Sequence, residues 1–303
     1  MKQLAVWALL VMLPAVLPAW GFDLQGHRGA RGLAPENTLA AFQRALQEGV
    51  DTLELDVVLT ADGVPMVSHD PALNPDLTRD ASGRWLAGPG PLILSLRWAD
   101  LQAYDVGRAR PDSKTARDFP QQAAADGQRI PRLAEVLALG GPRTRFNIEI
   151  KRDPTAPERY GPLPALVDAV AATVQAAGVA PRVVLQSFDW AVLQRWQQQM
   201  PLVPTAYLSI QRPNFNNVES PAWTAGRSLA VDGSVPRMVK AAGGRFWSPF
   251  FRDLTEAQVR EAQALGLQVV PWTVNEPADM ARLLAWRVDG LITDYPDRAR
   301  ALR

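Results

Sequence analysis

The sequence predicts an α/β protein whose strands close into a TIM-type (β/α)8 barrel. Short aliphatic or β-branched runs alternate with helical patterns, which is typical of parallel βαβ units. About eight such strands can be counted, and the 303 residues are enough for one barrel domain. An open doubly wound sheet is the alternative, because it is built from the same units.

The predicted elements follow one another along the chain. Strands are expected at 22–27, 52–59, 145–151, 182–188, 203–208, 245–248, 268–274 and 290–293. The first helical pattern carries Leu39, Phe42 and Leu46 on one face, begins after a cap at Asn37 or Thr38, and is followed by Gly49. Further helices are expected at 164–177, 190–199, 256–265 and 278–285.

Residues 1–21 are predicted to be a secretory signal peptide. Lys2 precedes an apolar run at 4–17, and residues 19–21 fit the small-x-small cleavage pattern. The run is short for a membrane span of about 20 residues. An uncleaved N-terminal anchor is the alternative. We therefore expect a barrel domain at 22–303 that is periplasmic or secreted and keeps no integral membrane segment after cleavage.

Residues 71–130 interrupt the alternation, with abundant Pro, Gly, Asp and Arg and weak periodicity. We expect an insertion after a hairpin formed by the second strand, with a short helix at 94–101. Loops that follow barrel strands line active sites, so this insertion is expected to shape specificity. A disordered surface loop is the alternative. Residues 212–231 are predicted to form a second loop.

The composition excludes several kinds of site. The 32 basic and 31 acidic residues provide no strong field for nucleic acid or an anionic membrane. The chain has no cysteine and only two histidines, which excludes thiolate chemistry, zinc–thiolate sites and a three-histidine zinc site. A metal would be held mainly by oxygen, which favours one hard divalent cation, Ca²⁺ or Mg²⁺.

Two predicted strands carry acidic side chains on one face. In 52–59, alternation places Glu54 and Asp56 on the same side, opposite the leucines between and beside them. In 145–151, Glu149 and Lys151 share a face in the same way. Buried carboxylates this close repel unless a cation lies between them. The alternatives are a simple Glu149–Lys151 pair or solvent-facing edge strands.

Both histidines lie at the ends of predicted strands that flank this acidic strand. Asp62-Gly63 predicts a two-residue hairpin turn, and carrying that register down the ladder places His69 opposite Asp56. A slip of one residue would turn His69 to the other face. His27 ends the first strand, which in a barrel is the catalytic end. Imidazole is the usual general acid or base near neutral pH.

Two cationic side chains complete the pattern. Arg28 follows His27, and Lys151 follows Glu149 on its strand. Both suit an anionic substrate. Two acid–base groups, three carboxylates and two cations together favour phosphoryl chemistry at a metal.

Several short blocks follow one another along the chain: HRGA at 27–30, APENTLAAF at 34–42, ELDV at 54–57, DGVP at 62–65, HDP at 69–71, NIEIK at 147–151, QSFD at 186–189, WTVN at 272–275 and GLITDYP at 290–296. In their residues and in their order these blocks resemble those of the glycerophosphodiester phosphodiesterases. The resemblance implies a barrel of the phosphodiesterase kind that hydrolyses glycerophosphodiesters to sn-glycerol 3-phosphate and an alcohol.

The resemblance also implies residue roles. It assigns the metal to Glu54, Asp56 and Glu149, acid–base catalysis to His27 and His69, phosphate contacts to Arg28 and Lys151, and the glycerol pocket to Trp272. In this chain Arg31 stands where a small residue is common, and we expect Arg31 to be solvated, with a phosphate or headgroup contact as the alternative. Asp294, near the end of the last strand, is expected to orient a catalytic group.

Other functions remain open at this point. A lysophospholipase D or a phospholipase that forms a cyclic phosphate could use the same barrel. A periplasmic solute-binding protein would also fit export and the α/β pattern, although it needs no acid–base pair. For each enzyme alternative the expected partner is a small-molecule substrate.

Overall fold

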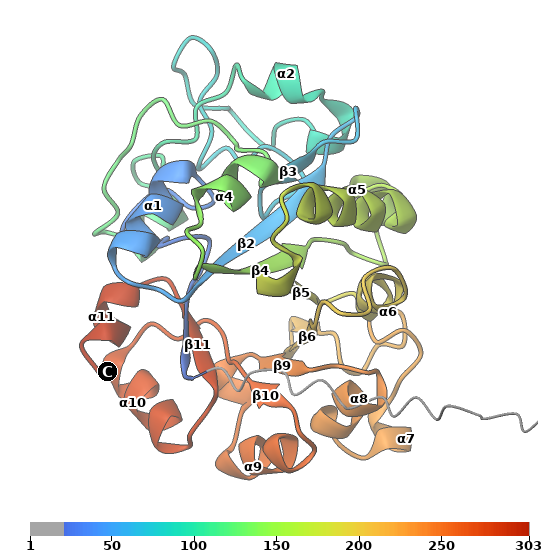
Figure 1. The fold of residues 1–303 in the computed structure, drawn as a ribbon. Helices are drawn as coiled ribbons and strands as arrows, with labels where there is room; N and C mark the ends of the chain where they lie inside the picture. Colours follow the sequence, from blue (N-terminus) through green and yellow to red (C-terminus); the bar gives the residue numbers. More distant parts are fainter. Residues whose placement is uncertain (1–20, 303) are drawn as a thin grey trace, which may run out of the picture.

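The chain folds as a barrel of eight parallel strands, described here for residues 21–302 in a computed structural model (Figure 1). The strands are β1 (Asp23–Gly26), β2 (Thr52–Leu59), β4 (Arg145–Ile150), β5 (Val183–Ser187), β6 (Thr205–Ser209), β9 (Phe246–Pro249), β10 (Gln268–Val269) and β11 (Gly290–Thr293). They pair in the order β10-β9-β6-β5-β4-β2-β1-β11. The amide of Ile292 donates to the carbonyl of Pro271 (3.0 Å), and that of Val274 donates to Ile292 (2.9 Å), which closes the ring. The barrel prediction is confirmed over the open sheet.

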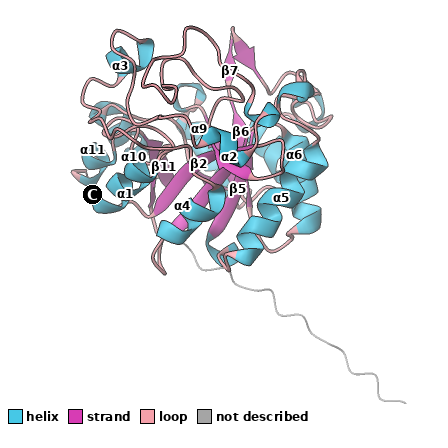
Figure 2. Cartoon of the chain, turned by 90° about the horizontal axis from the view of Figure 1, so that it is seen from above, coloured by secondary structure: helices cyan, strands magenta, loops and turns pink. Residues whose placement is uncertain are grey.

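Helices surround the strands in a ring (Figure 1), and in Figure 2 the strands are seen from the side with helices flanking them. They are α1 (Leu39–Gln47), α4 (Leu133–Leu139), α5 (Leu163–Ala176), α6 (Trp190–Gln199), α8 (Val235–Ala241), α9 (Glu256–Ala264), α10 (Pro277–Ala285) and α11 (Pro296–Arg300). Thr38 is the cap of α1, and its hydroxyl accepts from the amide of Ala41 at 3.1 Å. The helices α4, α8 and α11 were not predicted, because each spans at most seven residues and shows little periodicity.

The two faces of the strands have different surroundings. Leu53, Leu55 and Val57 of β2 point outward into the apolar layer under the helices, where they are fully buried. The opposite faces point into the barrel. On one side of the interior they are polar, and on the other they form a small apolar cluster of Val184, Ala206, Phe246, Val270 and Ile292. The predicted alternation on β2 is confirmed, and it places the acidic side chains inside the barrel.

The predicted hairpin register is wrong by one residue. Strand β3 (Pro65–Val67) runs antiparallel to β2, with Val57 beside Val67. The amide of Ser68, not that of His69, donates to the carbonyl of Asp56, at 3.0 Å. The turn has three residues instead of two, because Gly63 adopts a φ of 75° and adds a bulge. His69 nevertheless reaches the site, since the ladder has ended before it.

Residues 71–130 are ordered around a small core of their own, so the alternative of a disordered loop is wrong. Leu73, Ile93, Leu101 and Ile130 pack there with residues of the β2–β3 hairpin. The expected helix at 94–101 is divided into η1 (Ile93–Ser95) and α2 (Trp98–Leu101), and α3 (Lys114–Asp118) follows. The loop predicted at 212–231 holds part of a hairpin of β7 (Gln211–Arg212) and β8 (Phe215–Asn216) and the start of α7 (Leu229–Asp232). Three more 3-10 turns are η2 (Pro157–Arg159), η3 (Ala180–Arg182) and η4 (Phe251–Asp253).

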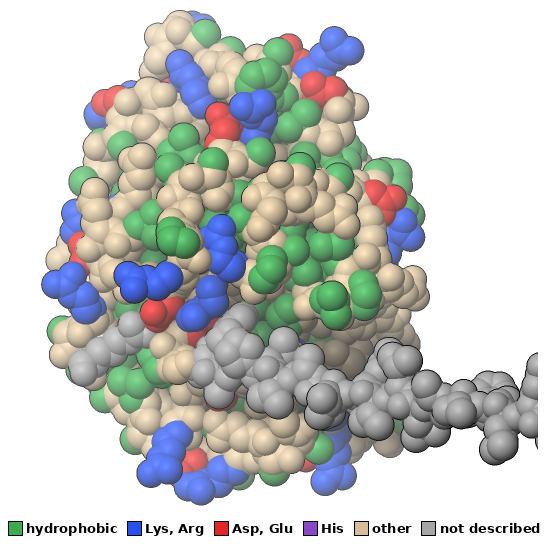
Figure 3. Space-filling view, viewed as in Figure 1, with side chains coloured by type: hydrophobic (Ala, Val, Ile, Leu, Met, Phe, Trp, Pro, Cys, Tyr) green, Lys and Arg blue, Asp and Glu red, His purple; other side chains and the backbone are tan. Residues whose placement is uncertain are grey.

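Among residues 21–302, none of the helices combines the length and apolar character needed to cross a membrane. The predicted signal peptide, apart from Gly21, lies outside the described residues. Basic and acidic side chains are interspersed on the face shown in Figure 3, which agrees with the balanced charge of the sequence.

Candidate active site

The loop after β1 forms one wall of the candidate site. His27 follows β1 directly, and Arg28 and Asn37 both adopt left-handed backbone, with φ of 50° and 55°. Such a conformation costs a non-glycine residue about 1–3 kcal/mol. The amide of Arg28 donates to Glu54 Oε2 (2.9 Å), and the amide of Asn37 donates to the carbonyl of Arg28 (3.0 Å). These bonds fix the strained loop against β2.

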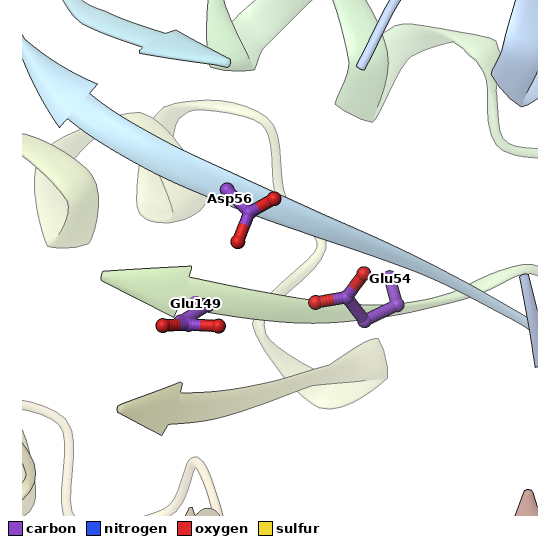
Figure 4. Close-up of side chains that lie close together, drawn as sticks. All are labelled: Glu54, Asp56 and Glu149. Atoms are coloured by element: carbon purple, nitrogen blue, oxygen red, sulfur yellow. The ribbon is translucent and has the colours of Figure 1, made fainter. Parts of the chain in front are cut away.

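Three carboxylates meet inside the barrel beside this loop. Glu54 and Asp56 project from β2, and Glu149 projects from the neighbouring β4 (Figure 4). The two strands pair with Asp56 directly beside Glu149. One oxygen from each carboxylate lies within 4.8 Å of the others, and the three residues are 1%, 1% and 6% exposed. We call these residues the acidic triad.

The pKa values of the acidic triad reflect this crowding. Burial and the other two carboxylates raise the pKa of Glu54 well above its usual value. Burial raises the pKa of Glu149 to about 7, although Lys151 opposes the shift from 2.7 Å. At Asp56, burial is outweighed by Arg28 and Lys151, which hold its pKa below the usual range. The triad therefore keeps protons near neutral pH that a cation would displace. Three buried carboxylates fit a hard divalent cation such as Ca²⁺ or Mg²⁺.

His27 is held by Asp294, the residue that follows β11. His27 Nδ1 lies 2.6 Å from Asp294 Oδ1. The carboxylate can only accept, so Nδ1 carries the proton and Nε2 is free to accept one. His27 Nε2 lies 4.0 Å from Glu54 Oε2, within the site. Burial lowers the pKa of His27 against the opposing effect of Asp294, so the ring is neutral at pH 7.

His69 pairs with a carboxylate in the same way. Its Nδ1 lies 2.8 Å from Asp70 Oδ1, which leaves Nε2 as the free nitrogen. Burial, with Arg28 and Lys151, lowers the pKa of His69 to about 4. Its side chain is 34% exposed, more than that of His27 at 11%. The second histidine is therefore the more accessible of the two.

Two buried cations lie between the histidines and the acidic triad. Arg28 Nη1 donates to Glu36 Oε1 (2.7 Å), and Arg28 Nε lies 3.2 Å from Asp56 Oδ2. Lys151 Nζ lies 2.7 Å from Glu149 Oε1 and 3.7 Å from Asp56 Oδ1. Glu36 thus pairs with Arg28 and orients its side chain.

The site opens into a cavity of about 170 Å³. The acidic triad contributes Glu54 and Glu149 to its lining, and both histidines also face it. Trp272 and Phe188 form an aromatic wall, with ring centroids 5.3 Å apart in an edge-to-face arrangement. Trp272 Nε1 donates to the carbonyl of Ser248 at 2.8 Å, which fixes the indole.

All eight residues singled out from the sequence lie at this end of the barrel. They are His27, Arg28, Glu54, Asp56, His69, Glu149, Lys151 and Trp272. Their catalytic and binding roles stay predictions.

Sequence reasoning missed two amide side chains. Asn37, taken as a possible helix cap, instead donates from Nδ2 to Asp56 Oδ2 at 3.0 Å. Gln186 Nε2 donates to Glu54 Oε1 at 2.7 Å, and Gln186 Oε1 accepts from Asn147 at 3.0 Å. For Gln186 the available signal was a polar residue at an inward position of β5, whereas Asn37 lies in the loop after β1, where no strand pattern marks it.

The expectation that Arg31 is solvated is wrong. Its side chain is 17% exposed and forms a two-pronged contact with Asp294, from Nε to Oδ1 (2.9 Å) and from Nη2 to Oδ2 (3.1 Å). Arg31 and His27 hold the pKa of Asp294 below its usual range, although burial opposes them. The expectation that Asp294 contacts a catalytic candidate agrees with the structure.

Comparisons with known proteins agree on one family. Residues 27–298 match the model of the Glycerophosphoryl diester phosphodiesterase family. A glycerophosphodiester phosphodiesterase of Bacillus altitudinis is 31% identical over 282 residues, covering 91% of this chain and 96% of that protein. One of Bacillus subtilis is 30% identical over 277 residues, covering 89% and 83%.

Solved structures share the fold. A chain from Silicibacter pomeroyi, assigned as a glycerophosphoryl diester phosphodiesterase, is 41% identical and superposes with a TM-score of 0.82 over 92% of each chain. An Oleispira antarctica phosphodiesterase, solved with the product sn-glycerol-3-phosphate, is 22% identical with a TM-score of 0.68, covering 93% of this chain and 96% of that one.

Proposed function

Because this chain belongs to the glycerophosphoryl diester phosphodiesterase family and is an enzyme of that class, we propose that it hydrolyses glycerophosphodiesters to sn-glycerol 3-phosphate and an alcohol, using a divalent cation and two histidines. The observation that carries this proposal is that both histidines of the chain and three buried carboxylates meet at one cavity. Family membership favours an enzyme over the solute-binding alternative.

The acidic triad is the proposed cation site. When bound, the cation would polarise the phosphoryl oxygens and neutralise developing charge. The triad is supported by neighbours that hold its carboxylates in place: Gln186 and the Arg28 amide donate to Glu54, and Asn37 donates to Asp56. Such supporting bonds restrict the carboxylates to orientations that suit a ligand.

The substrate is proposed to lie across the cavity. Arg28 and Lys151 would bind the anionic phosphate, since both are buried cations that face the cavity. The glycerol carbons would pack on the aromatic wall of Trp272 and Phe188. The alcohol would then extend toward His69, which is the more exposed histidine.

His27 is proposed as the general base. Its Nδ1 is occupied by Asp294, so Nε2 can take a proton from the attacking hydroxyl group. That hydroxyl belongs either to water or to the substrate itself, which would pass through a cyclic phosphate. His69, whose Nε2 is unprotonated in the free site, would first take up a proton from solvent at Nε2 beside the bound anionic phosphate, and would then pass that proton to the departing alkoxide.

The proposed substrate class is tested by a panel of diesters. We expect release of sn-glycerol 3-phosphate from deacylated, water-soluble diesters such as glycerophosphocholine, measured with a coupled enzyme assay. Lysophosphatidylcholine should be a poor substrate beside them. Turnover of the lysolipid alone would contradict the proposal in favour of a lysophospholipase D. Binding of the diesters with cation but without any turnover would favour a binding protein.

Export is a separate proposal, supported by the pattern of residues 1–21. We expect the protein secreted by a bacterial host to begin after residue 21. Mass spectrometry of the mature chain checks this, and an intact N-terminus on membrane-bound protein would favour the uncleaved anchor.

A further inference from the structure

Arg31 lines the cavity with a mostly buried side chain, and the proposed mechanism does not use it. Arg31 donates to the Asp294 carboxylate from two nitrogens, and that carboxylate accepts four side-chain hydrogen bonds in all. Asp294 Oδ1 accepts from His27 and Arg31, and Oδ2 accepts from Arg31 and Asn275 (2.7 Å). Asn275 Oδ1 also accepts from the amide of Asp294 at 3.0 Å. With both oxygens engaged, rotation of the carboxylate would break several bonds at once.

Residues of the insertion contact both the side chain and the backbone of Arg31. The guanidinium carbon of Arg31 lies 4.5 Å from the centre of the Phe119 ring, which is a cation–π contact. Gln122 Nε2 donates to the carbonyl of Arg31 at 2.8 Å, and the amide of Ala123 donates to the carbonyl of Leu33 at 2.9 Å. The end of the insertion therefore docks on the loop that carries Arg31.

We propose that Arg31, clamped by Phe119 and Gln122 of the insertion, is a positioning residue that fixes the Asp294 carboxylate and through it the ring of His27. This inference rests on the proposed function for its kinetic consequence. The chain of contacts is continuous from the insertion to the imidazole, although Arg31 and Asp294 are 263 residues apart in sequence. The insertion would thus act on catalysis as well as on the shape of the entrance.

The chemical reason lies in the tautomer of His27. A base must keep Nε2 free and aimed at the attacking group, and Asp294 achieves both by holding Nδ1–H. Without Arg31, the Asp294 carboxylate would keep the hydrogen bond from Asn275 but lose the two hydrogen bonds from Arg31. The imidazole would then sample orientations that do not react, which lowers kcat while substrate binding by other residues is retained.

The test compares Arg31→Ala with the same change in an Asp294→Asn background. We expect Arg31→Ala to lower kcat about 10- to 100-fold, the size typical of a lost orienting contact, with KM nearly unchanged. In the Asp294→Asn background, Arg31→Ala should add little, because Arg31 acts through that carboxylate. An equal fold-reduction of kcat by Arg31→Ala in both backgrounds would overturn the proposal. Arg31→Lys keeps the positive charge but lacks the planar guanidinium that donates to both carboxylate oxygens, so an intermediate kcat is expected. This variant keeps the proposal testable if Arg31→Ala does not fold.

The insertion's part is tested with a matched pair of cation–π contacts. Phe119→Leu should lower kcat several-fold, and Phe119→Tyr should restore it. Trp98→Leu removes a second such contact of the insertion, where Arg132 lies 4.5 Å from the ring centre, and should leave kcat unchanged. An equal loss from Trp98→Leu would show a general effect of the insertion and overturn the specific clamp.

Because the chain has only two histidines, NMR of their rings gives a measurement that does not depend on activity. With only His27 and His69 in the chain, the ring resonances can be assigned by deletion. We expect the Nδ1–H proton signal of His27 in wild type, and its broadening or loss in Arg31→Ala and Phe119→Leu. An unchanged signal in Arg31→Ala would overturn the proposal. A wild type that turns over no diester would overturn the proposed function, and this signal would still decide the clamp.

Discussion

Replacement of His27 or His69 with alanine is expected to lower turnover of glycerophosphocholine by about 10²- to 10⁴-fold, the usual contribution of a general acid or base. The chain has no other imidazole that could substitute. His27→Ala removes the nitrogen proposed to accept the proton, and His69→Ala removes the proposed donor to the leaving alkoxide. Release of sn-glycerol 3-phosphate measures the effect, and circular dichroism checks that each variant is folded.

The matched control for the histidine variants is Ser68→Ala. Ser68 is the neighbour of His69, and its hydroxyl donates to the carbonyl of Asp70 at 3.0 Å. We expect its turnover to stay within a few-fold of wild type, because its hydroxyl makes no bond to the acidic triad or to a catalytic nitrogen. Near-normal turnover in His27→Ala or His69→Ala would contradict the acid–base roles.

The second large effect is expected from the acidic triad. Glu54→Gln, Asp56→Asn and Glu149→Gln should each lower turnover by roughly 10²-fold or more, since a bound cation supplies several kcal/mol to phosphoryl chemistry. The same variants should lose the rise in melting temperature that added Ca²⁺ or Mg²⁺ gives the wild type. Calorimetry and the coupled assay measure the two losses.

A buried acid elsewhere is the control for the triad. Asp23 is 3% exposed and pairs with Arg145 at 2.7 Å, at the opposite end of β1 from His27. Asp23→Asn is expected to lower stability while the cation still raises its melting temperature. A triad variant that kept the cation-dependent rise would contradict the metal assignment.

The pH dependence of cation binding follows from the same carboxylates. The pKa of Glu149 is raised to about 7 and that of Glu54 is raised as well, so protons compete with the cation up to neutral pH. Cation binding must release these protons, and affinity should therefore rise as the pH increases from roughly 5.5 to 8. Affinity that falls as the pH increases would contradict the assignment.

Local regularities made much of the barrel and site predictable. The two-residue period of a strand is visible in sequence, and it placed Glu54 and Asp56 together inside the barrel. The position of Glu149 beside Asp56 depends on the register between β2 and β4, which residue patterns alone do not determine. The family resemblance supplied that step.

What could not be predicted depends on distant contacts. The hairpin register was wrong because Gly63 makes a three-residue turn, and sequence alone favours the commoner two-residue form. Arg31 was misjudged because its partners Asp294 and Phe119 lie far along the chain. The insertion's core is assembled from scattered residues such as Leu73 and Ile130, which show no periodic pattern.

The most direct test of the central proposal is ³¹P NMR of glycerophosphocholine incubated with chelated enzyme and then with one cation restored. The proposal predicts that the phosphorus signal of sn-glycerol 3-phosphate appears only after Ca²⁺ or Mg²⁺ is added, and not with Glu54→Gln. Product formed at the same rate in chelator, or phosphocholine and glycerol as the products, would contradict it.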